Sequence, residues 1–108
     1  MNYLTQAQVL TDAARAVVDA AARHLAQRCA VDGRISSSKL DEHQTVAYDL
    51  ANVASALTAA EHLVNVAERG GFTAQLALVF AADLHADLRG LLAGREAAWG
   101  LQTAETTA

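Results

Sequence analysis

The chain has 108 residues, a formal net charge of −4 and a pI near 5.4, and 53% of its residues are hydrophobic. A chain of this length is expected to form one domain. Its eight Lys and Arg residues are scattered rather than gathered into a patch, which argues against nucleic acid as a partner. The single cysteine, Cys29, excludes a disulfide within the chain.

The sequence has no feature of a membrane protein. The first residues, MNYLTQAQ, contain neither a basic segment nor an apolar run, so no secretion signal is expected. No apolar run approaches the roughly 18 residues that a membrane-spanning helix needs. We therefore expect no membrane contact and a cytoplasmic location, where a lone thiol stays reduced.

The residue types predict helices. Proline is absent, and the apolar residues are chiefly Ala, Val and Leu, so we expect an all-α fold. Three long helices are predicted, over residues 5–31, 39–69 and 73–98. Short connections between them predict an up-down bundle. Residues 1–101 are expected to form this single helical-bundle domain, and residues 102–108 a polar, disordered tail.

The segments between these helices contain residues that end and begin helices. Gly33 suits the left-handed position that follows the first helix. Ser38 or Asp41 is expected to cap the second helix, with Asp41 and Glu42 near its first turn, where acids favour the positive end of the helix dipole. Thr73 is expected to cap the third helix.

Apolar residues recur at steps of three and four along each predicted helix, which indicates one buried face per helix. In the second helix the steps alternate regularly, as in a heptad seam. The three faces are Leu10, Ala14, Val17, Ala21, Leu25 and Cys29; then Val46, Leu50, Val53, Leu57, Ala60, Val64 and Ala67; then Leu76, Phe80, Leu84, Leu88 and Leu91.

Ala-rich helices bury little area each, and three of them would leave apolar faces uncovered. We therefore expect self-association to a dimer or tetramer that completes a four-helix-type or larger bundle. A stripe of small and polar residues on the second helix suits close contact with another helix. Its members are Gln44, Tyr48, Ala51, Ser55, Thr58 and His62.

The start of the second helix resembles a known family. Leu40, Gln44 and the Leu50-Ala51 pair have the spacing of the segment that opens the C-terminal helical domain of acyl-CoA dehydrogenases, and the resemblance spans about residues 9–101. It implies that in a parent enzyme this domain forms the subunit interface and part of the FAD site for α,β-dehydrogenation of acyl-CoA. The missing dehydrogenase domains would be its partners, and the chain alone would be inactive.

The same resemblance implies cofactor-binding residues. Gln44 occupies the position of a family glutamine that holds the FAD of a neighbouring subunit. The family arginine falls on Gly33, so Arg34 would take its place only after a shift of one residue in the loop. Neither the catalytic glutamate nor the middle β domain of the family is present, so no catalytic residue is assigned.

Two hypotheses of other classes stand beside this one. The chain could be a non-enzymatic helical module that serves oligomerisation or interaction. A four-helix metal or cofactor carrier is disfavoured, because no E-x-x-H or H-x-x-x-H spacing is present. Asp41, Glu42 and His43 are consecutive and point about 100° apart on a helix, so they cannot converge on one ion. No metal ligand is assigned.

The remaining polar residues have plain interpretations. Cys29 lies on an apolar stripe and is expected to be a buried, inert thiol. Glu61, Glu68, Asp83 and Asp87 are expected on solvated faces. Asp83 and Asp87 are four residues apart and repel one another unless Arg89 or a partner relieves them.

Overall fold

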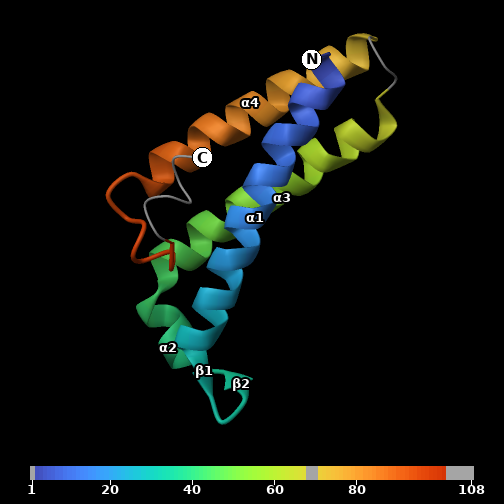
Figure 1. Ribbon diagram of the computed structural model, residues 1–108. Helices are drawn as coiled ribbons and strands as arrows, with labels where there is room; N and C mark the ends of the chain where they lie inside the picture. Colours follow the sequence, from blue (N-terminus) through green and yellow to red (C-terminus); the bar gives the residue numbers. More distant parts are fainter. Residues whose placement is uncertain (1, 68–70, 102–108) are drawn as a thin grey trace.

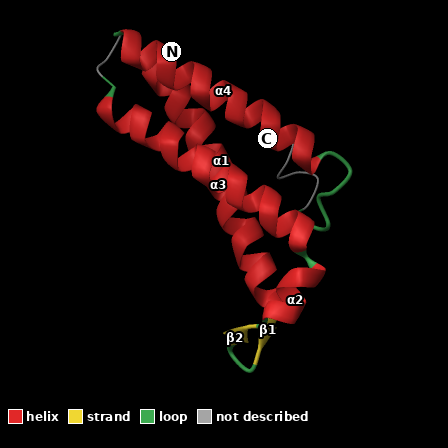
Figure 2. Ribbon diagram, turned by 180° about the vertical axis from the view of Figure 1, so that it is seen from behind, coloured by secondary structure: helices red, strands yellow, loops and turns green. Residues whose placement is uncertain are grey.

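Four helices and a small two-stranded ribbon make up the described part of the chain, residues 2–67 and 71–101 of a computed structural model (Figure 1). Helices account for most of these residues, so the predicted all-α class is confirmed apart from the ribbon (Figure 2). In chain order the elements are α1 (Tyr3–Cys29), β1 (Ala30–Val31), β2 (Arg34–Ile35), α2 (Ser37–Glu42), α3 (Gln44–Val66) and α4 (Phe72–Leu92).

The first helix begins at a side-chain cap and ends in a hairpin. The Asn2 side chain accepts a hydrogen bond from the Thr5 backbone N–H at 2.8 Å, which satisfies one free donor of the first turn. At the other end, Asp32 and Gly33 both have left-handed backbones, with φ of 52° and 77°. Two such residues form the tight turn that matches strand twist, so β1 and β2 pair around them. Gly33 is left-handed as predicted, but in a hairpin rather than a helix end.

The second connection differs from its prediction. Ser36, not Ser38 or Asp41, is the cap, and its Oγ accepts a hydrogen bond from the Lys39 N–H at 3.4 Å. The run of serines offers several caps, and the earliest one starts the short helix α2. Asp41 therefore lies at the end of α2 instead of in the first turn of a long helix, and His43 separates α2 from α3.

The last helix is shorter than predicted. Gly71, not Thr73, occupies the cap position of α4, without a side-chain hydrogen bond. The helix ends at Leu92 rather than at Ala98, because Ala93 leaves the helical region and Gly94 is left-handed, with φ of 76°. The predicted end of the second helix near residue 69 and the predicted tail over residues 102–108 lie outside the described residues.

Helices α1, α3 and α4 pack against one another in an elongated body of 49 × 25 × 18 Å (Figure 1). Alanine supplies much of the inner surface, which lets the helix axes approach closely. The predicted seam of the second helix is buried inside its own chain, so it is core and not an open association surface. The buried residues of these three helices are Ala7, Thr11, Ala14, Val18, Ala21 and Cys29; Leu50, Val53, Leu57, Ala60 and Val64; and Ala74, Ala77, Ala81, Leu84, Leu88 and Leu92.

The predicted face of the third helix is wrong in its first half. Leu76 and Phe80 are exposed, and the neighbouring alanines Ala77 and Ala81 point to the core instead. At this end of the molecule the fully buried residues are three alanines and Val64, and the large side chain of α4 that packs against them is the half-buried Leu78, not Phe80.

The chain after α4 folds back and closes the other end of the core. Trp99 and Leu101 are buried there with residues of α1, α3 and α4. Between these two residues stands Gly100, which has a left-handed φ of 72° and lies directly against the His24 ring of α1. A methyl group at this position would overlap that ring.

Gly100→Ala should therefore lower the free energy of unfolding by about 2–4 kcal/mol, from left-handed strain plus the overlap with His24. Gly94→Ala is the matched control, because Gly94 is also left-handed but has open space around an added Cβ. It should cost only about 1–2 kcal/mol. Urea denaturation of both variants measures the difference. Equal losses of unfolding free energy would contradict the prediction, because they would show that the His24 ring moves away from the new methyl group without cost.

Candidate functional site

Gln44, the first predicted cofactor residue, is the first residue of α3 and is exposed. It lies at the edge of an open hollow of about 620 Å³ at the corner between α2 and α3. The hollow contains two carboxylates, Asp41 and Asp49, beside the Tyr48 ring. The Asp49 carboxylate lies 3.9 Å from a guanidinium nitrogen of Arg95.

Arg34, the second predicted cofactor residue, lies in β2, where it pairs with Val31 across the hairpin. Its side chain is exposed, and it is not among the residues that line the hollow at Gln44. The structure therefore does not bring the two residues into one pocket.

The hollow does not fit the pyrophosphate of FAD. A pyrophosphate needs cationic side chains or converging backbone N–H groups. Asp41 and Asp49 present negative charge instead, and the nearby cation, Arg95, is paired with Asp49. The flavin site of Gln44 and Arg34 stays a prediction, and no chemical step is derived through it.

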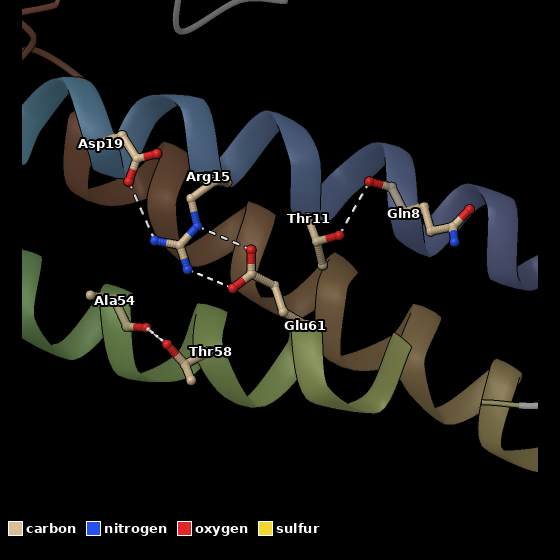
Figure 3. A network of polar contacts seen from close by, with 7 residues as sticks. All are labelled: Gln8, Thr11, Arg15, Asp19, Ala54, Thr58 and Glu61. Carbon is tan, nitrogen blue, oxygen red and sulfur yellow. Dashed lines mark hydrogen bonds and ion pairs between the residues drawn. The ribbon is translucent and has the colours of Figure 1, made fainter. Parts of the chain in front are cut away.

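An ion-pair network links α1 to α3 (Figure 3). The guanidinium of Arg15 donates from two nitrogens to the Glu61 carboxylate, with a distance of 3.0 Å from Nε to Oε2, and a third nitrogen lies 3.4 Å from Asp19. The hydrogen bond from Arg15 to Glu61 raises the pKa of Arg15 above its usual range. Glu61 is thus a structural partner, and the prediction that it lies on a purely solvated face is wrong.

The least expected surface is on α4. Four large apolar side chains are open to solvent there: Phe72 at 77%, Val79 at 56%, Phe80 at 46% and Leu76 at 37% of their full exposure. We name this set the α4 outer face. It lies roughly opposite the buried alanines of the same helix, since residues four and seven apart share a side. Leu76 and Phe80 were predicted to be core residues, because periodicity in the sequence reveals an apolar stripe without showing what covers it.

A groove between α1 and α4 is the second unassigned surface. Its volume is about 420 Å³, its floor and walls are mostly apolar, and cationic side chains stand around it. We name it the α1–α4 groove. Its lining residues are Ala13, Ala14, Ala16, Val17, Ala20, Arg23, His85, Leu88, Arg89 and Leu92.

Two classes of site find no support within residues 2–67 and 71–101. No group of three or more His, Cys, Asp or Glu side chains is placed to hold a metal ion, and Cys29 is a buried free thiol. None of the helices in this part of the chain is long and apolar enough to cross a bilayer.

Comparison with protein-family models, with curated proteins and with solved structures finds no match to this chain.

Glu61→Gln should lower the free energy of unfolding by about 1 kcal/mol, because the pair with Arg15 is bidentate but partly open to solvent. Asp19→Asn is the control, since its contact with Arg15 lies within one helix and should contribute about 0.3–0.5 kcal/mol. Thermal unfolding at low and high NaCl measures both. A Glu61→Gln loss that does not shrink in salt would contradict the electrostatic origin.

Proposed function

We propose that this chain is a non-enzymatic helical association module that binds a second copy of itself through the α4 outer face. The observation that carries the proposal is the inverted arrangement of α4. Its first half directs Ala77 and Ala81 into the core and leaves Phe72, Val79 and Phe80 in solvent. Surface phenylalanines in a row oppose solubility unless a partner covers them.

The size of the face sets the expected strength. Four partly exposed apolar side chains correspond to a patch of roughly 300–600 Å², the range of functional patches on monomeric proteins. That is below the approximately 800 Å² per partner of a standard stable interface. Association through this face should therefore be reversible and depend on protein concentration in the micromolar range.

The seam of α3 does not serve this purpose. Leu50 and Leu57 are buried within the chain, so an acidic substitution there would unfold the core instead of reporting on association. The small and polar stripe that includes Tyr48 and Ser55 is exposed, but it offers few large apolar side chains. The α4 outer face is thus the surface to test.

Val79→Glu should convert the associated species to monomer, because a carboxylate would be desolvated in the middle of the contact. Val9→Glu is the matched control: Val9 on α1 is 53% exposed, close to the 56% of Val79, but lies outside the α4 outer face. Light scattering during size exclusion at several protein concentrations measures the mass. The proposal fails if the unchanged chain stays monomeric, or if both variants dissociate equally.

The FAD site implied by the resemblance to acyl-CoA dehydrogenases is tested separately. If Gln44 belongs to an FAD site of a larger enzyme, the purified peak should carry flavin absorbance, or take up added FAD, and Gln44→Ala should weaken that uptake about tenfold or more, as expected for a buried polar contact. Thr45→Ala, at the neighbouring position in the same hollow, is the control. A chain that binds no flavin at any concentration would leave this prediction without support.

A further inference from the structure

We propose that copies of this chain associate head to tail, with the α4 outer face of one copy docked in the α1–α4 groove of the next. The inference rests on the self-association proposed above and adds the surface that receives the α4 outer face. The same surface pair, repeated from copy to copy, builds an open row.

The groove has the shape for such a guest. Ala13, Ala16 and Ala20 give α1 a wall of methyl groups along the groove, so about 420 Å³ between the helices is unfilled. Large side chains on one helix pack well against small ones on another, because the combination restores interior packing density. Phe80 and Val79 are large and exposed on the outer face, and the alanine wall is the small counterpart.

Charge selects this groove. Arg23 and Arg89 stand at it, and no acid is among its lining residues. Within the described residues neither arginine has an ion-pair partner, and Asp19, one turn before Arg23, is held by Arg15. A chain with a net charge of −4 repels its own copies, so a local cationic surface is the place where an acidic part of a second copy is favoured.

The acids that match these arginines follow the α4 outer face along the same helix. Asp83 and Asp87 are exposed, and neither has an ion pair in the part of the chain that the structure describes. They are the two acids that repel one another unless a partner relieves them. By contrast, the groove on the other flank of α4 contains Asp87 itself and Asp49, so an acidic guest would be repelled there.

The order of apolar and charged positions along α4 of one copy agrees with the order of alanines and arginines along the α1–α4 groove of the next copy. From Val79 to Asp87 is eight residues, about 12 Å of helix, and from Ala16 to Arg23 is seven residues, about 10 Å. Helices α1 and α4 run in the same general direction (Figure 1). If α4 of a second copy docks in the groove parallel to these two helices, its apolar residues lie against the alanines and its acids lie against the arginines.

The positions on α4 make the contact heterologous. Phe72 and Val79 lie on one side of the helix, and the groove residues Leu88 and Leu92 lie roughly opposite, at about 100° per residue. One partner cannot cover both sides, so each copy donates a face to one neighbour and a groove to another.

Two single variants and their mixture test this arrangement. Val79→Glu removes the face and keeps the groove, whereas Ala16→Trp fills the groove and keeps the face. Each alone should be monomeric, and an equimolar mixture should form a closed one-to-one heterodimer, because one intact face meets one intact groove. Ala22→Trp is the control for the bulky residue, since Ala22 is an exposed alanine of α1 outside the groove.

A charge exchange at exposed positions gives a second test that does not change the packing. Arg89→Glu and Asp87→Arg should each weaken association at least tenfold, and mixing the two variants should restore it. Raising NaCl should weaken the unchanged protein's association severalfold. Light scattering with size exclusion reads all of these masses, and circular dichroism verifies that every variant is helical.

The outcomes separate this inference from the proposed function. If Val79→Glu is monomeric while Ala16→Trp associates like the unchanged chain, outer faces pair with each other and the head-to-tail contact is overturned, although self-association stands. A mixture that stays monomeric, or an Ala22→Trp variant that dissociates like Ala16→Trp, also overturns it. If the unchanged chain is monomeric, both the proposed self-association and the head-to-tail contact are overturned.

Discussion

Close contact between alanine-rich inner faces is the constraint on which the rest of this structure depends. Ala7, Ala60 and Ala77 have no accessible surface, and each comes from a different one of the three long helices. Where two helices cross at alanines, the distance between their axes can fall to the lower end of the usual range of about 8–10 Å. Close approach supplies dense packing with little apolar area, so each helix contributes modestly to the core.

Other contacts compensate for the small area. Trp99, in the segment that folds back after α4, is buried in the core with residues of all three long helices. The bidentate contact of Arg15 with Glu61 holds α1 to α3 from outside the core. Both devices fix the positions of helices that have few large side chains between them.

The same constraint determines the surface. Where Ala77 and Ala81 occupy the inner side of α4, its large apolar residues other than the half-buried Leu78 remain outside, beginning with Phe72. Where alanines of α1 stand beside α4 at its other end, the space between the helices is left as a groove with Arg23 and Arg89 around it. The α4 outer face and the α1–α4 groove thus both follow from one distribution of small residues, and the acids that follow the outer face are opposite in charge to the arginines at the groove.

The amino-acid order was sufficient for the helical class, for the inner face of α3, for half of the inner face of α1 and for the left-handed Gly33, because each depends on local propensity and on the 3.6-residue period. Choosing Ser36 as cap over Ser38 depended on tertiary context, since both have the same intrinsic preference. The side of α4 that is buried, and therefore the outward position of Phe80, followed from its packing against α1 and α3, which periodicity along one helix does not contain. The groove likewise needs two helices at once, so only the folded chain could reveal it.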